Sequence, residues 1–352
     1  MRRTILFLTV AVSLLTGASL RAQDLGFAFF GDYLESLRRQ AGIPGMTAVI
    51  VGSDGVLWTR SFGLASVERN IGTRTDTPLH VDGLTQLITS SIVLRCVEEG
   101  RLSLSDRVGQ FDPGSPDAGA TLAQVLSHTS GSADGSAFDY RLARLAPLGL
   151  AIDACTGVPF RAAVVDFLNQ NAMMDSVPGA DTIRLTPSDP GMSEHNLRRY
   201  ADVLQRLATS YAVDRTGRPA PAAQHPSITL TPSGGLVSTA DDFAKFDLAL
   251  KRGQILKPDT IAAAWRAPLG PSGQALPHGL GWFVQGYKGE RIVWQYGMTE
   301  NVSSSLIVTI VPRGLTLILI ANSDGLAKPF ALTAGDVVAS PFGKVFLGTF
   351  VR

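Results

Sequence analysis

The sequence predicts an α+β fold, in which an antiparallel sheet is assembled from both ends of the chain and a mostly helical insertion lies between them. Three observations lead to this prediction. Runs rich in β-branched and aromatic residues occur near the start of the chain and again after residue 275. The segment between them has apolar residues at helical spacing and little strand signal. The composition, 45% hydrophobic and 17% charged, is that of a globular protein rather than a disordered one.

The first residues have the pattern of an export signal. Arg2 and Arg3 precede an apolar run from Ile5 to about Leu15, and a cleavage position follows Ala22. The run is too short for a spanning helix. We therefore interpret residues 1–22 as a secretory signal peptide and expect an exported protein, periplasmic or extracellular. A retained N-terminal anchor is the alternative.

The charge balance argues against a nucleic-acid partner. The chain has 31 Lys and Arg against 30 Asp and Glu, a formal charge of +1. Removing the three arginines within residues 1–22 changes this to −2. Such a surface lacks the basic stripe that phosphates demand. No second apolar run reaches the roughly 18 residues that a spanning helix needs, so we expect no membrane span after signal cleavage.

The N-terminal part is predicted to form a helix and a β-hairpin. Apolar residues at helical spacing over residues 30–41 predict a helix that ends at Gly42. Residues 46–51 and 56–62 are β-rich, and residues 53–55 between them have turn chemistry. The chain thus begins with a helix followed by two antiparallel strands.

Helices dominate the prediction for the middle of the chain. A buried helix over residues 83–99 ends at Gly100. Further helices are predicted over residues 142–155 and from about residue 238 to 250. The stretch over residues 186–226 is rich in Pro and Arg and receives no assignment.

The C-terminal part returns to strands. Short turns between them predict antiparallel neighbours, and a final helix is expected over residues 330–338. We therefore expect one domain over residues 23–352, with residues 23–80 and 275–352 as its sheet subdomain and residues 81–274 as its helical subdomain. The predicted strands of this part cover residues 281–285, 291–296, 303–311 and 315–322.

The two cysteines, Cys96 and Cys155, both lie in predicted buried helices. We expect each to pack as a small apolar thiol, and a disulfide in an oxidising compartment is the alternative. With five scattered histidines they form neither a Cys-x-x-Cys nor a His-x-x-x-His pair. We therefore expect no metal and no other cofactor.

Five short blocks occur in order between residues 43 and 325: IPG (43–45), GRLSLSD (100–106), LSHTSG (126–131), PSGGLVSTA (232–240) and ANSD (321–324). Together they resemble the serine β-lactamase-related family, which includes class C β-lactamases, D-Ala-D-Ala carboxypeptidases and lipase-like esterases. The resemblance implies that the predicted sheet and helices form a β-lactamase/transpeptidase-like fold. It also implies, as ligand, a peptidoglycan fragment or a small carbonyl-containing molecule.

The family's reaction uses Ser-x-x-Lys at the start of the buried helix. Residues three apart share a helix face, so the lysine amine can take the proton of the serine hydroxyl. The resemblance places Gly83 at the serine and Gln86 at the lysine. Glycine has no side chain, and a glutamine amide is no base at neutral pH. Neither group needed for acylation is present.

No shift of register restores this motif, because the chain has only six lysines. None of them has a serine or threonine three positions earlier. The Gly-x-Ser-x-Gly nucleophile elbow is also absent. The residues three positions before the lysines are Asp242, Leu248, Gln254, Gln285, Gly325 and Pro341.

Two further family elements are altered. Tyr140 matches the tyrosine of Tyr-x-Asn, but Leu142 stands at the amide position. On the strand that carries Lys-Thr-Gly or His-x-Gly in the family, Gln295 replaces the cation and is followed by Tyr296 and Gly297. A cation there would attract a substrate carboxylate, so Gln295 weakens the recognition of β-lactams and peptides.

Three functions follow from these positions. The first is a catalytically degenerate hydrolase homologue that keeps a scaffold or a ligand-binding cleft. The second is an active hydrolase of esterase, peptidase or β-lactamase type with a non-standard mechanism around Tyr140, helped by His80. The third is a structural protein whose cleft is filled by side chains. We interpret His128 as structural and expect Asp82 to cap the buried helix.

Overall fold

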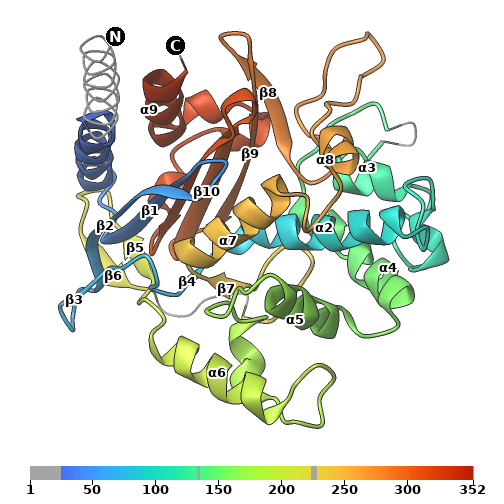
Figure 1. Ribbon diagram of the computed structural model, residues 1–352, viewed down its shortest axis with the longest axis horizontal. Helices are drawn as coiled ribbons and strands as arrows, with labels where there is room; N and C mark the ends of the chain where they lie inside the picture. Colours follow the sequence, from blue (N-terminus) through green and yellow to red (C-terminus); the bar gives the residue numbers. More distant parts are fainter. Residues whose placement is uncertain (1–24, 133–134, 223–227, 352) are drawn as a thin grey trace, which may run out of the picture.

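The computed structural model describes residues 25–132, 135–222 and 228–351, so the predicted signal peptide lies outside the described residues (Figure 1). Its centre is a seven-stranded sheet in the order β3-β2-β1-β11-β10-β9-β8, and every pair of neighbours is antiparallel. Its strands are β1 (Gly45–Val51), β2 (Val56–Ser66), β3 (Ile71–Gly72), β8 (Phe283–Tyr287), β9 (Glu290–Thr299), β10 (Ser303–Ile310) and β11 (Leu315–Ala321).

The two ends of the chain meet at the middle of the sheet. Strand β1 pairs with β11 in a register that places Met46 opposite Ala321 and Val51 opposite Thr316. Both strands are almost wholly buried because helices cover the two faces of the sheet. The predicted α+β fold, with its sheet assembled from both chain ends, is therefore confirmed.

One face of the sheet is covered by the two terminal helices. The N-terminal helix, residues 25–40, and α9 (Pro341–Phe350) lie together on this face (Figure 1). Phe30 packs against Phe346 and Phe350, with ring centroids 6.0 and 5.4 Å apart. These rings belong to one apolar cluster with the outer side chains of the sheet.

The predicted final helix over residues 330–338 is wrong. Those residues form two short 3₁₀ turns, Leu332–Ala334 and Val337–Ala339, separated by Gly335 at φ +86°. A left-handed residue ends a helical run. The helix α9 starts later, with Pro341 in its first turn, where the missing N–H of proline costs nothing.

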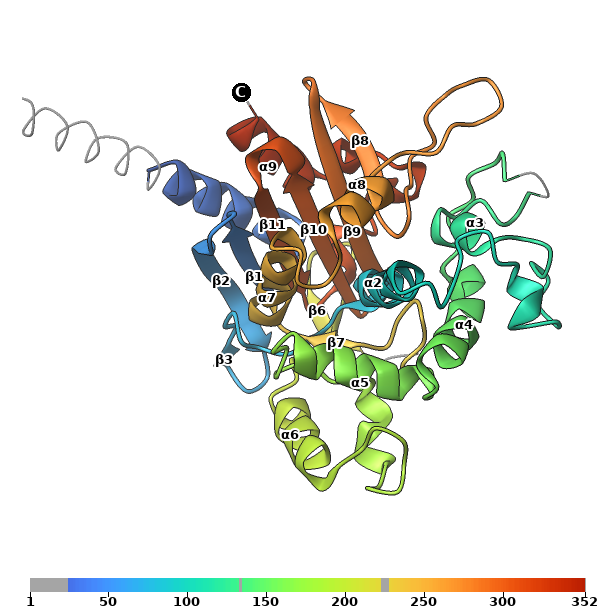
Figure 2. The same cartoon turned by 45° about the vertical axis from the view of Figure 1, so that its right-hand side comes forward.

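The helical segment covers the other face of the sheet (Figure 2). Helix α2 (Thr85–Glu98) follows the 3₁₀ turn η1 (Asp82–Leu84) and is buried on nearly all sides, although it carries several hydroxyl side chains. The other helices are α3 (Leu122–Leu126), α4 (Pro147–Thr156), α5 (Phe160–Gln170), α6 (Glu194–Gln205), α7 (Ala240–Lys251) and α8 (Pro258–Ala264).

The second predicted helix begins later than its sequence pattern indicates. Leu142 lies in a 3₁₀ turn, η3 (Leu142–Leu145), and α4 starts at Pro147 and ends before Gly157, at φ +74°. The unassigned stretch contains α6 and a small hairpin of β5 (Tyr211–Val213) and β6 (Pro219–Pro221). A second small pair joins β4 (Leu79–His80) to β7 (Val237–Ser238).

The expectation of free thiols is also wrong. Cys96 on α2 and Cys155 on α4 form a disulfide, with their Cα atoms 6.3 Å apart. This separation is within the usual range for a bridge. The two positions are 59 residues apart in the chain, and only the packing of α4 against α2 brings them together.

No single helix within the described ranges is long and apolar enough to cross a membrane. Residues 142–156 and 160–170 pass that test only jointly, and a bend of 74° separates them. Both segments contribute side chains to the core around α2.

Candidate functional site

Gly83 lies in the turn before α2 with its backbone directly against strand β9. A Cβ atom built on Gly83 would lie 2.7 Å from the carbonyl oxygen of Tyr296 and 3.3 Å from the Cα of Gly297. A Cβ on Gly297 would in turn meet the Gly83 nitrogen at 2.6 Å. Two glycines therefore let the turn and the strand touch backbone to backbone. A side chain at position 83 would therefore meet the backbone of β9.

Asp82 anchors this turn to the sheet. Its carboxylate accepts hydrogen bonds from Thr299 at 2.5 Å and Ser303 at 2.7 Å, on β9 and β10. Ser305 donates to the carbonyl oxygen of Val81 at 2.7 Å. Neither η1 nor α2 has a side-chain cap, so the expectation that Asp82 caps the helix is wrong. Its carboxylate holds Gly83 against β9 instead.

Gln86 lies one turn further along α2, with only 1% of its surface exposed. Its amide nitrogen donates to the Tyr140 hydroxyl at 2.9 Å. Its carbonyl oxygen lies 3.2 Å from Nε2 of His128, which therefore carries the proton and donates it. A neutral amide thus joins two ring side chains at the place of the family's lysine.

Gln295, on β9, continues the chain of hydrogen bonds. Its side-chain oxygen accepts from the Tyr140 hydroxyl at 3.1 Å and from the Tyr296 backbone N–H at 2.9 Å. Its amide nitrogen lies 3.2 Å from Nε2 of His278 and 3.3 Å from the Gly281 carbonyl. Nδ1 of His278 donates to the Gly279 carbonyl at 2.8 Å, so its Nε2 is the acceptor for Gln295.

The five side chains linked in this way are here called the neutral network; its members, in order of connection, are His128, Gln86, Tyr140, Gln295 and His278. Desolvation lowers the pKa of His278 to about 3. The pKa of His128 also falls well below its usual range, because of burial and then the nearby His278. Desolvation raises the pKa of the Tyr140 hydroxyl well above 10, and the adjacent Tyr296 adds to this. Every member is therefore uncharged at neutral pH.

Aromatic rings fill the space around the network. Tyr140 lies 4.5 Å from the His128 ring, 5.0 Å from Phe283 and 5.6 Å from Tyr296, measured between ring centroids. Phe283 stacks on Trp294 at 4.2 Å. These rings surround Tyr140, which itself remains partly exposed.

The structure brings together the predicted positions Gly83, Gln86, Tyr140, Gln295, Tyr296 and Gly297. Leu142 is different, because it packs against the core of the helical segment. The sequence reasoning missed His278 and gave His128 only a structural role. His278 lies in a loop without a motif, so no sequence signal points to it. His80 is buried in β4.

The described residues contain no convergent group of three His, Cys, Asp or Glu side chains that could hold a metal ion. In the neutral network itself, the two histidines use three of their four ring nitrogens in hydrogen bonds to described residues. The fourth ring nitrogen, Nδ1 of His128, is buried and has no hydrogen-bond partner among the described residues.

Comparison with known proteins gives a family and a fold for the chain. A model of the family "Beta-lactamase" matches residues 30–339. Penicillin-binding protein 4 of Amycolatopsis lactamdurans is 30% identical over 142 residues, which cover 37% of this chain and 35% of that protein. The chain thus spans about a third of the length of this curated relative.

Solved structures show the same fold. The octameric penicillin-binding protein homologue from Pyrococcus abyssi has a TM-score of 0.72 at 20% identity, over 92% of this chain and 77% of that chain. The D-alanine carboxypeptidase AmpC from Burkholderia cenocepacia has a TM-score of 0.71 at 16% identity, over 93% of this chain and 100% of that chain. At these identities the likeness is one of fold.

Proposed function

This chain belongs to the β-lactamase family, and we propose that within it the protein is an exported, catalytically inactive member that serves as a scaffold. One observation carries the proposal. The space of the nucleophile at Gly83 is taken by the Tyr296 carbonyl, and the space of the general base is taken by the amide of Gln86. The features at Gly83 and at Gln86 both fit a scaffold protein that keeps the family's fold and has lost its reaction.

The expected loss of activity is large. In a serine protease, removal of the nucleophile alone lowers turnover about a million-fold. Here the lysine is also replaced, and the cation on β9 is the neutral Gln295. The remaining groups can donate hydrogen bonds but cannot form an acyl-enzyme.

The alternative, hydrolysis driven by Tyr140, has less support. A tyrosine that acts as a base must lose its proton near neutral pH, and the pKa of Tyr140 is shifted the other way. Its hydroxyl is also engaged on both sides, because it accepts from Gln86 and donates to Gln295. We therefore assign Tyr140 to the packing of the neutral network.

Export is supported by the disulfide. Bridges such as Cys96–Cys155 form and persist in oxidising compartments and are rare in the cytosol. Together with the apolar N-terminal segment, this favours a periplasmic or extracellular location. A fusion of the first residues to a reporter that works only outside the cytosol tests this proposal, and a silent reporter would contradict it.

The central test is acylation. Purified protein is incubated with a chromogenic β-lactam, a p-nitrophenyl ester and a fluorescent penicillin, and its intact mass is then measured. We expect turnover at the rate of the buffer and no added mass. A serine β-lactamase run beside it shows that the reagents are active. Turnover at ordinary enzyme rates would overturn the proposal.

A peptidoglycan fragment is the first ligand to test for the scaffold, since the relatives found include penicillin-binding proteins and a D-alanine carboxypeptidase. Because Gly83 lies against β9 and aromatic rings surround Tyr140, we expect any binding to use the outer surface. Sedimentation with purified peptidoglycan measures it. Binding that disappears when Tyr140 is replaced by Phe would instead point to the network.

A further inference from the structure

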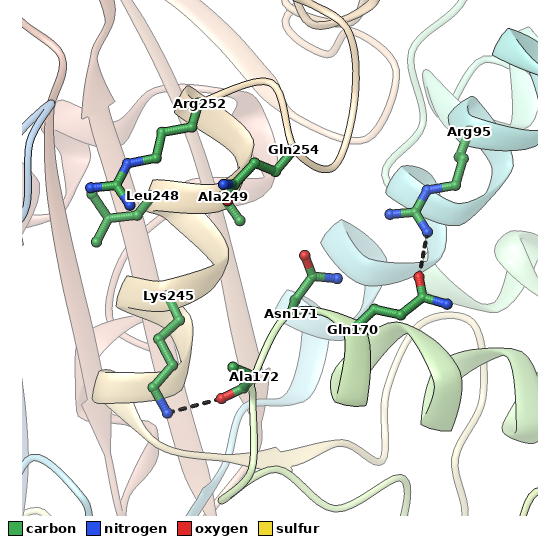
Figure 3. Close-up of a pocket in the computed structure, with 9 residues that line it drawn as sticks. All are labelled: Arg95, Gln170, Asn171, Ala172, Lys245, Leu248, Ala249, Arg252 and Gln254. Atoms are coloured by element: carbon green, nitrogen blue, oxygen red, sulfur yellow. Dashed lines mark hydrogen bonds between the residues drawn. The ribbon is translucent and has the colours of Figure 1, made fainter.

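The cavity between α2, α5 and α7 has no set of charged groups that converge on one ligand (Figure 3). Arg252 points toward the turn between β1 and β2, where it donates to the Asp54 carbonyl oxygen at 2.9 Å. Arg95, on the other wall, donates to the Gln170 side-chain oxygen at 2.9 Å. Each guanidinium thus binds its own neighbourhood, and we assign no ligand to this cavity.

The N-terminal helix, in contrast, is apolar on more than the face that packs on the sheet. Within residues 25–34 the only charged residue is Asp32, which pairs with Arg60 at 2.9 Å. A helix that is apolar all round is usually buried all round. The described residues bury only the side of this helix that carries Phe27 and Phe30. They leave apolar surface on its opposite side uncovered.

Three side chains spaced four residues apart form this uncovered side, and they are here called the exposed stripe: Leu25, Phe29 and Tyr33. Residues four apart share one face of a helix. Their exposed fractions are 59%, 68% and 63%. Single exposed apolar residues are normal on a protein surface. Every other aromatic side chain of the described residues is buried or partly buried, however, so the two fully exposed rings lie together on one stripe.

The packing of the opposite face keeps the exposed stripe directed outward. The ring of Phe27 lies 6.3 Å from that of Trp58 on β2 and 5.6 Å from that of Phe350 on α9, measured between centroids. A Cβ atom on Gly31 would lie 3.0 Å from the Trp58 ring, so the helix and β2 are in close contact. Figure 1 shows the dark-blue helix beside β2 at one edge of the molecule. The helix cannot rotate to bury the stripe without losing these contacts.

The exposed stripe follows closely after the apolar run of the predicted signal peptide. That run extends to Leu20, five residues before Leu25. Five residues span at most about 18 Å even when fully extended. When the run lies in a bilayer during export, the stripe therefore begins within about 18 Å of the lipid. This proximity favours a lipid surface as the partner of the stripe.

We propose that the exposed stripe contacts a lipid bilayer, at the surface of the membrane that the chain crosses. The proposal rests on the export proposed above and does not depend on the loss of the reaction. Aromatic side chains favour the boundary between lipid headgroups and acyl chains. The Tyr33 ring would lie at that boundary with its hydroxyl among the headgroups. The helix would lie along the surface, and the protein would be bound peripherally.

Vesicles of phosphatidylcholine and phosphatidylglycerol test the contact directly. In the purified full chain, Phe29→Cys is labelled with NBD, a fluorophore that responds to the polarity of its surroundings. We expect vesicles to shift the NBD emission to the blue and to increase it. The same label at Ile183→Cys, where the side chain is 69% exposed outside the helix, should not respond. No response at position 29, or an equal response at both positions, would overturn the proposal. Because the measurement needs no export, it can fail or succeed separately from the reporter fusion.

Polar replacement measures how much the exposed stripe contributes. Phe29→Ser with Tyr33→Ser should weaken vesicle binding in flotation about tenfold or more, because full burial of one such side chain is worth at least that factor. Ile183→Ser with Leu269→Ser removes two exposed apolar side chains elsewhere and should change binding less than about twofold. Equal weakening in both variants, or none in either, would overturn the assignment.

Light scattering distinguishes lipid from a second copy of the chain. We expect the same mass in solution for the parent and for the variant that lacks Phe29 and Tyr33. Self-association of the parent that disappears in this variant, in protein that does not bind vesicles, would assign the exposed stripe to a second copy and contradict the proposal. Thermal melting shows that each variant is folded.

Discussion

Gly83 lacks the hydroxyl that a nucleophile needs, and the same residue makes a close packing contact with β9. Its α-carbon faces the Tyr296 carbonyl so closely that a Cβ atom requires β9 to move. We expect Gly83→Ser to lower the free energy of unfolding by about 1–3 kcal/mol, the usual cost of overpacking. Urea denaturation measures this change.

Gly72 offers a matched control for that substitution. It lies on the exposed edge strand β3, and a Cβ atom there would meet no atom within 4 Å. Gly72→Ser should therefore change stability by less than about 0.5 kcal/mol. If Gly83→Ser proved equally harmless, the contact between η1 and β9 would not be a barrier to a serine.

Restoration of both lost groups is not expected to restore the reaction. In the double variant Gly83→Ser with Gln86→Lys, a lysine would replace a fully buried amide whose partners are Tyr140 and His128. An unpaired ammonium is costly in such a place. We predict no covalent adduct with a fluorescent penicillin by intact-mass measurement. Stoichiometric labelling would mean that the site opens more readily than its packing indicates.

At the scale of the elements, the bridge between α2 and α4 is the clearest source of stability. Cys96 and Cys155 enclose a long loop, and a bridge of this kind contributes about 2–4 kcal/mol. Cys96→Ser with Cys155→Ser should lower the free energy of unfolding by this amount in chemical denaturation. A reductant should destabilise the parent and leave the variant unchanged. Equal stability of both proteins would show that helix packing alone suffices.

Elements with a strong local pattern could be predicted from the sequence, and those that depend on distant contacts could not. The alternating, β-branched runs located β1 and β9 to β11 within a few residues. The apolar spacing over residues 330–338 was misleading, because those side chains pack on the sheet from 3₁₀ turns around Gly335. The disulfide depends on how α2 and α4 pack, and sequence spacing does not report that.

The candidate site follows the same division. The sequence blocks located Gly83, Gln86, Tyr140 and Gln295, because each has a fixed place in the resemblance. They did not reveal that amides and histidines close the space between these positions. The hydrogen bond between His278 and Gln295 depends on the fold of the loop that carries His278, which the sequence pattern does not report.

At the scale of the whole molecule, the neutral network joins the helical segment to the sheet. His128, Gln86 and Tyr140 come from the helical side, and Gln295 lies on β9. Both histidines are neutral when folded, since burial depresses the pKa of each. Protonation of His278 at Nε2 would break its hydrogen bond from Gln295, and protonation of His128 at Nδ1 would place a charge on a buried nitrogen that has no partner among the described residues.

This arrangement predicts a stability that falls in mild acid. A histidine in the unfolded chain takes up a proton near pH 6.5, whereas His278 in the folded protein does so only near pH 3. The unfolded state therefore binds more protons between these two pH values. The free energy of unfolding then falls by about 1.4 kcal/mol per pH unit of acidification for each such histidine. The stability that depends on a neutral histidine is fully present above about pH 6.5 and is lost as the pH falls below that value.

Urea denaturation at several values between about pH 7.5 and 5 measures this slope. His278→Gln should make the slope shallower by about 1.4 kcal/mol per pH unit, because it removes one such group. His195→Gln, at an exposed position on α6, should leave the slope unchanged. Identical slopes in all three proteins would show that the buried histidines do not control the acid response.

The pairing of β1 with β11 also determines when the molecule can fold. The ribosome synthesises Met46 of β1 275 residues before Ala321, its partner on β11 (321 − 46 = 275). Contacts between such distant segments have a large closure entropy and form slowly. The growing chain therefore lacks a finished sheet until β11 has been synthesised. This delay fits the export that we propose, because a chain that has not closed its sheet remains unfolded while it crosses a membrane.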